Sequence, residues 1–225
     1  MTTISQNAIE QLIPGIRKNI ARLVKDAYGK KPFDDPRDLD GVAQDLLPES
    51  SRNCSACADI ENKRLVSHND RDLKTTRQKN AERKPKSNEP KMHSLSSQKR
   101  KEEHAELRIG DYAAARYAQE LGSDDEYDAA KAVKSIDYVG IFQPCCVMCA
   151  VCFAVAGLAK KTRGYHTKQI TKWEWPPFIK ADTAKLLEIL GKDAVETIGS
   201  NEKSLEAVLQ AVVTRAGQSN WSDVF

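Results

Sequence analysis

Two short segments constrain this chain of 225 residues more than any other feature of it. The first is His-Ala-Glu at residues 104–106, and the second is Pro-Cys-Cys-Val-Met-Cys-Ala at residues 144–150. The imidazole of His104 and two cysteine thiolates are good zinc ligands, and they leave a fourth tetrahedral position for water, as in catalytic zinc sites. Glu106, two residues after the histidine, is a ready proton carrier for that water. The fold then has to bring both segments to one metal ion.

The two segments are close to the H-x-E and P-C-x-x-C signature of zinc-dependent deaminases, and the chain resembles the cytidine deaminase-like superfamily. The run Cys-Val-Met-Cys-Ala at 146–150 looks most like the tRNA adenosine deaminases, whereas its long, irregular surroundings look more like the bacterial toxin deaminases. The specific match covers about ten residues, and a weaker match in layout extends over residues 50–175. The resemblance implies that His104, Cys146 and Cys149 hold zinc, and that Glu106 is the catalytic acid and base.

An extra cysteine leaves the pair of thiolate ligands open. The superfamily usually has proline directly before its first cysteine ligand, but here Cys145 follows Pro144. The pair is Cys146 with Cys149, Cys145 with Cys149, or Cys149 with Cys152. We favour the first pair because it keeps both the two-residue spacing and the Val-Met-Cys-Ala match. Cys145 is then a spare thiol near the metal and the alternative ligand.

Other candidate residues flank the motif. Cys54 and Cys57 form a second C-x-x-C pair, so a structural site with four thiolates is an alternative. Their long separation from the other cysteines argues against it, and we expect both to be small buried residues in or near the first strand. His166, Trp173 and Trp175 are candidate substrate-binding residues, because aromatic rings can stack on a flipped base. Packing at the sheet edge is the alternative for them.

The formal net charge is only +3, but its distribution is uneven. Residues 63–101 contain thirteen Lys or Arg against four Asp or Glu. This stretch is either a solvated loop or a cationic arm that leads to the His-x-Glu helix and follows a phosphate backbone. We therefore expect a nucleic-acid partner, DNA rather than RNA. The resemblance to toxin deaminases adds an immunity or carrier protein as a further partner.

The sequence indicates no association with a membrane. No stretch approaches the roughly eighteen apolar residues of a membrane span, and residues 1–25 lack the apolar core of a signal peptide. Four of the six cysteines lie at 145–152, which is typical of metal or redox chemistry in a reducing compartment. We expect a cytoplasmic protein, or one secreted by a route without a classical signal peptide.

The pattern of apolar residues predicts an α/β chain. By resemblance, the expected architecture is the three-layer α/β/α sandwich of the cytidine deaminase-like type, with helices flanking a small mixed sheet. We expect helical residues 1–48 as an N-terminal extension, residues 49–178 as the zinc deaminase core with a basic insertion at 68–101, and residues 179–225 as C-terminal helices packed on that core. The elements expected are helices at 5–28, 36–47, 102–121, 144–158, 180–191 and 202–216, and strands at 54–60, 64–67, 136–142 and 164–175.

These observations together predict a hydrolase that deaminates a nucleobase with zinc. The substrate class expected first is cytosine in DNA, in a toxin-type or effector-type enzyme, because toxin-type relatives often act on cytosine. Adenosine in RNA and free nucleosides or bases are alternatives. A zinc-stabilised nucleic-acid-binding module is the alternative that is not an enzyme, and Glu106 argues against it because a structural zinc site does not need a carboxylate there.

Overall fold

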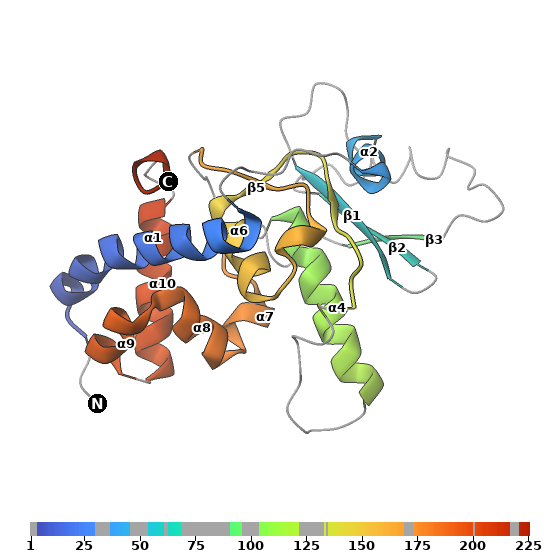
Figure 1. Ribbon diagram of the computed structural model, residues 1–225. Coiled ribbons are helices and arrows are strands. Elements are labelled where there is room, and N and C mark those ends of the chain that lie inside the picture. The colour runs from blue at the N-terminus through green and yellow to red at the C-terminus, as the bar shows by residue number, and fades with distance from the viewer. Residues whose placement is uncertain are drawn as a thin grey trace.

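The computed structural model describes residues 4–29, 37–45, 54–60, 63–68, 91–95, 104–121, 133, 135–168, 173–199, 201–216 and 221–225. In it, helices gather on one side of the molecule and a small sheet on the other, with two central helices between them (Figure 1). Among the described residues, no helix combines the length and apolar character that crossing a membrane requires.

The long N-terminal helix α1 spans Gln6–Tyr28. The side chain of Ser5 caps its start by accepting a hydrogen bond from the backbone N–H of Ala8 at 3.3 Å, and Gly29 ends it with a φ of 85°. Its apolar residues recur at helical spacing, and its buried stripe packs against the central helix α6 (Val147–Val155) and against helices near the C-terminus. The expected helix at 5–28 is therefore confirmed.

The principal sheet has four strands in the order β3-β2-β1-β4. β1 (Ser55–Ile60) pairs antiparallel with β2 (Lys63–His68) and with β4 (Gly140–Ile141), whereas β3 (Lys91–Ser94) lies parallel to β2. The expected hairpin and the mixed character of the sheet are confirmed. Strand β3 corrects the expectation that residues 68–101 form only a loop; the rest of that basic insertion lies outside the described residues, apart from His68 at the end of β2 and Leu95.

Helices pack on both faces of this sheet. α2 (Asp38–Asp45) contacts β1 and β4, and a small apolar cluster joins its Ala43 to Cys57 and Val66 of the strands. α4 (Ala105–Leu121) contacts β1 and β2, whose alternate residues belong to the main core. The mixed α/β class is thus confirmed, and the specific three-layer superfamily architecture stays a proposal.

A second, two-stranded sheet carries the cysteine segment. β5 (Cys145–Cys146) pairs in parallel with β6 (Tyr165–His166), and α6 begins directly after β5. The expected helix at 144–158 is therefore shorter at both ends, because pairing with β6 keeps residues 145–146 extended. Within the described residues of the expected strands at 136–142 and 164–175, only 140–141 and 165–166 pair as strands, next to one isolated bridge between Val139 and Thr162, and residues 169–172 lie outside the described part of the chain.

The C-terminal region has more helices than we expected. It contains α7 (Pro177–Lys180), α8 (Thr183–Leu190), α9 (Lys192–Ile198) and α10 (Glu202–Ala216), with short 3₁₀ turns at Ala159–Lys161 and Trp221–Asp223. Gly191, with a φ of 85°, divides α8 from α9. One continuous apolar core joins α1, α4, α6 and these helices. The domain boundaries at residues 48 and 178 remain a proposal.

Candidate metal centre and active site

Three potential metal ligands converge where α4 and α6 begin. The Cys146 Sγ and Cys149 Sγ atoms lie 3.4 Å apart, and His104 Nδ1 lies 3.6 Å from the former and 3.4 Å from the latter. Zinc–sulfur bonds of ~2.3 Å and zinc–nitrogen bonds of ~2.0 Å at tetrahedral angles put two sulfurs about 3.8 Å apart and a sulfur and a nitrogen about 3.6 Å apart. The three donor atoms therefore fit one face of a zinc coordination tetrahedron.

Local structure explains why these side chains meet. His104 immediately precedes α4, and its carbonyl accepts hydrogen bonds from the backbone N–H groups of Leu107 and Arg108 at 3.1 and 3.3 Å. Cys146 is the N-cap residue of α6, and Cys149 lies in the first turn of that helix. Both cysteines are thus at a helix N-terminus, where free N–H groups and the helix dipole favour a thiolate.

The three cysteine pairs left open by the sequence differ in geometry. Cys146 belongs to the group of three potential ligands, whereas Cys145 and Cys152 do not, although both are buried. Burial and the negative charges of Glu106 and Cys146 raise the pKa of Cys145 well above its ordinary value. The geometry therefore favours Cys146 with Cys149 as the thiolate pair.

The charges of the three ligands are strongly coupled. Burial opposes the charged form of His104, but the neighbouring Cys146 thiolate raises the pKa of the imidazole to about 9. Burial likewise opposes the Cys146 thiolate, but the side chains of Cys149 and His104 hold the pKa of Cys146 well below its ordinary value. Burial and the Cys146 charge raise the pKa of Cys149. These pKa directions favour an imidazolium beside a thiolate, so metal binding would displace protons from the site.

Glu106 lies beside the ligands and is almost completely buried, with 1% of its surface exposed. Its Oε1 atom is 3.9 Å from His104 Nδ1. The residue occupies the first turn of α4, where the helix dipole stabilises a negative charge. A carboxylate in this position can exchange protons with a molecule bound against the three ligands.

Cys54, which we expected only as a small residue in or near the first strand, is also a neighbour of the site. It immediately precedes β1, and its thiol lies 3.9 Å from Glu106 Oε2. Burial, followed by the negative charge of Glu106, raises the pKa of Cys54 well above its ordinary value. A neutral thiol therefore faces the carboxyl group. Only the meeting of β1 with α4 reveals this contact, because the two residues are far apart in the sequence.

Cys57 occupies a different environment. It is buried in β1, and its thiol donates a hydrogen bond to the carbonyl of Leu39 at 3.0 Å. Among the described residues, the only group of three or more His, Cys, Asp or Glu suited to a metal is the one formed by His104, Cys146 and Cys149. Cys54 and Cys57 thus behave as small strand residues, and a four-thiolate site receives no support.

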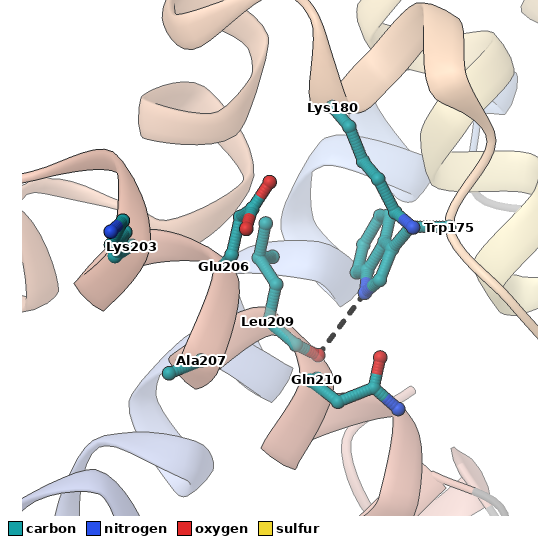
Figure 2. A pocket seen from close by; sticks show the side chains of 7 residues that line it. All are labelled: Trp175, Lys180, Lys203, Glu206, Ala207, Leu209 and Gln210. Atoms are coloured by element: carbon teal, nitrogen blue, oxygen red, sulfur yellow. Dashed lines mark hydrogen bonds between the residues drawn. The ribbon is translucent and has the colours of Figure 1, made fainter.

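The two tryptophans of the candidate substrate site are buried, at 4% exposed for Trp173 and 2% for Trp175. Their rings pack edge to face with centroids 4.8 Å apart. The indole N–H of Trp173 donates to Cys149 Sγ at 3.1 Å, and that of Trp175 donates to the carbonyl of Leu209 at 3.1 Å (Figure 2). These contacts are those of the packing alternative, and a role of either ring in substrate binding stays a prediction.

The position of His166 is compatible with the expected role in substrate binding. It is half-buried and pairs with Cys146 across the register of β5 and β6. Its Nδ1 atom accepts a hydrogen bond from the backbone N–H of Lys168 at 3.2 Å, and burial lowers the pKa of the ring. A neutral imidazole beside a metal ligand remains a candidate substrate contact.

A cavity of about 400 Å³ lies elsewhere, among Trp175, α7 and α10 (Figure 2). Its lining residues are Trp175, Lys180, Lys203, Glu206, Ala207, Leu209 and Gln210. None of them is one of the three potential metal ligands. This cavity is therefore separate from the candidate metal centre.

Comparison with known proteins addresses the same segment of the chain. A family model described as "OTT_1508_deam:-like deaminase" matches residues 103–177, which make up about a third of the chain. No curated protein and no solved structure matches the chain significantly. The matched stretch contains His104, Glu106, Cys146 and Cys149. Residues 103–177 thus resemble a deaminase domain, and the match supports a place for them in a deaminase superfamily.

Proposed function

We propose that this protein is a zinc-dependent enzyme that hydrolytically deaminates a nucleobase. The observation that carries the proposal is the position of buried Glu106 beside three donor atoms that are spaced as on a zinc tetrahedron. The deaminase-like stretch at 103–177 contains all four residues. A purely structural zinc site has no use for a buried carboxylate next to an open coordination position.

The chemistry that zinc supplies when bound is a water whose pKa is lowered toward neutrality. With zinc bound, Glu106 would accept a proton from this water while the water oxygen attacks the ring carbon that bears the amino group. Glu106 would then deliver the proton to the ring nitrogen and assist departure of the amino group as ammonia. One water is consumed and one ammonia released, and a carbonyl replaces the amino group. Burial of Glu106 keeps bulk water from competing for this proton.

Cytosine in DNA is the substrate class that we propose, in a toxin-type or effector-type enzyme. Its support is the resemblance to toxin deaminases, together with the excess of positive charge in residues 63–101, close to the ligand His104 in the sequence. Nucleic acid is then the principal partner, and an immunity or carrier protein is a further one. Adenosine in RNA and free nucleosides remain alternatives that the same experiment separates.

The test is incubation of zinc-loaded protein with single- and double-stranded DNA, RNA and free nucleosides. Sequencing detects C-to-T and A-to-G changes in DNA and RNA, and measurement of released ammonia detects deamination of free nucleosides. We expect C-to-T changes in DNA, and none with Glu106→Gln protein carrying the same zinc. Conversion of free nucleosides alone would contradict the proposed polymer substrate, and no conversion of any substrate would contradict deamination.

A second measurement tests the role of the basic stretch. The variant for this test lacks residues 71–88. The deletion ends there because β3 occupies residues 91–94. We expect the deletion to weaken DNA binding and to reduce the slope of its salt dependence, because it removes seven Lys and Arg side chains that could face phosphates. An unchanged slope would show that the stretch is a solvated loop.

A further inference from the structure

One hydrogen bond joins the candidate metal centre to a side chain outside it. The indole N–H of Trp173 donates to the Sγ atom of Cys149 at 3.1 Å. Trp173 is 4% exposed and Cys149 is fully buried, so water does not compete for this bond. Trp173 comes from the segment that precedes α7, whereas Cys149 is in the first turn of α6.

We propose that Trp173 is a positioning residue of the metal centre, which orients the Cys149 sulfur and stabilises its negative charge as a ligand. This role rests on the proposed function only in that it assumes the same three metal ligands. An indole N–H can donate a hydrogen bond but cannot accept one, so the contact suits a metal-ligating thiolate, which needs no proton of its own. A hydrogen bond to a charged acceptor in a buried site is stronger than one between neutral groups.

Partners of metal ligands commonly control how firmly a metal is held. They fix the orientation of the ligand, and their loss typically costs 10- to 100-fold in metal affinity or activity. The Cys149 sulfur is 3.4 Å from both of the other donor atoms, so a small rotation of its side chain would spoil two of the three ligand spacings. The indole therefore holds in place the ligand on which the geometry of the site depends.

The chain offers a matched control for this role. Trp175 is equally buried, and it packs edge to face on Trp173, but its N–H donates to the backbone carbonyl of Leu209. Trp173→Phe and Trp175→Phe each remove one buried indole N–H and keep an aromatic ring. Only the first removes a hydrogen bond to a metal ligand, so a difference between the two variants separates positioning from packing.

The experiment measures metal retention without any substrate. Zinc-loaded wild-type and variant proteins are mixed with an excess of chelator, and zinc release is followed with time. We expect Trp173→Phe to release zinc about 10-fold faster or more, and Trp175→Phe to stay within about twofold of wild type. With cobalt in place of zinc, the sulfur-to-metal charge-transfer band should move to longer wavelength in Trp173→Phe only, because its thiolate lone pairs are less stabilised.

Equal zinc release from Trp173→Phe and wild type, or equal acceleration in both variants, would overturn the positioning role. If Trp173→Phe does not fold, benzothienylalanine at position 173 replaces only the indole N–H by sulfur and gives the same comparison. A wild-type protein that binds zinc but deaminates nothing would contradict the proposed function and leave this test intact. A wild-type protein that binds no zinc would overturn both.

Discussion

Asp40 provides the strongest test of how the N-terminal segment supports the site. The residue is 3% exposed, and its carboxylate accepts three hydrogen bonds of 2.7 Å, from the N–H of Arg37, the hydroxyl of Tyr138 and the N–H of Ile141. It thereby ties α2 to β4, four residues before the cysteine segment begins. Asp40→Asn keeps one acceptor oxygen and turns an N–H group toward a buried donor.

The magnitude follows from these contacts. A hydrogen bond to a charged group contributes about 1.5–3 kcal/mol, and a buried donor left without a partner costs about 1–3 kcal/mol. We therefore expect Asp40→Asn to lower the free energy of unfolding by about 3 kcal/mol. In urea, with both proteins zinc-loaded, this loss corresponds to a midpoint lower by about 1 M.

Tyr138→Phe is the control for this measurement, because it removes one of the three donors and leaves the carboxylate its other two. Its cost should be smaller, at about 1.5 kcal/mol. An Asp40→Asn protein whose unfolding free energy lies within about 0.5 kcal/mol of wild type would refute the reasoning, since surface substitutions without partners have effects of that size.

Two further predictions concern the ligands and a close backbone contact. Cys146→Ser should abolish stoichiometric zinc binding while Cys145→Ser retains it, as measured by metal analysis of purified protein; the reverse result would move the ligand register by one residue. Gly140→Ala should lower the free energy of unfolding by about 2–3 kcal/mol, because a Cβ atom there would lie 2.4 Å from the backbone of Leu39, and backbone moves aside less easily than a side chain. A thermal unfolding midpoint equal to that of wild type would contradict this close contact.

The sequence predicted elements best where one periodic pattern was long enough to be unambiguous. The helix at Gln6–Tyr28 has apolar residues at regular helical spacing and a serine cap, so local signals and tertiary packing agree. Strand β3 was missed because its four residues, Lys91–Ser94, alternate too briefly among basic neighbours to show a pattern. Its pairing with β2 is a tertiary contact, which no local signal reports.

The expected strand at 136–142 is longer than the strand in the structure, because its apolar pattern extends beyond the residues that pair. Most of its residues are apolar, but only Gly140 and Ile141 pair with β1. Ile136, Tyr138 and Val139 are buried, and among the described residues their one strand-like contact is the bridge at Val139. The apolar pattern thus reflects burial in the core and not pairing in a sheet. The cysteine helix was expected too early, since Cys145 and Cys146 pair with β6, and that pairing is a tertiary contact.

The candidate ligands were predictable because their spacing reflects a local constraint. Cys146 and Cys149 lie one helical turn apart, so any helix that starts there brings the two sulfurs together. The neighbours of these ligands were not predictable in the same way. Cys54 reaches Glu106 through the sheet, and Trp173 reaches Cys149 through a segment of irregular structure, so their roles depend on tertiary contacts alone.

The most direct test of the proposed chemistry is the ratio of deamination rates between wild type and Glu106→Gln, with metal analysis showing one zinc in each. Glutamine keeps the size of the side chain but cannot carry the proton. We expect turnover of cytosine in DNA to fall by about 10²- to 10⁴-fold or more with zinc retained, which is the usual contribution of a general acid and base. Turnover near the wild-type rate in the zinc-loaded variant would contradict the assignment of Glu106 and the mechanism built on it.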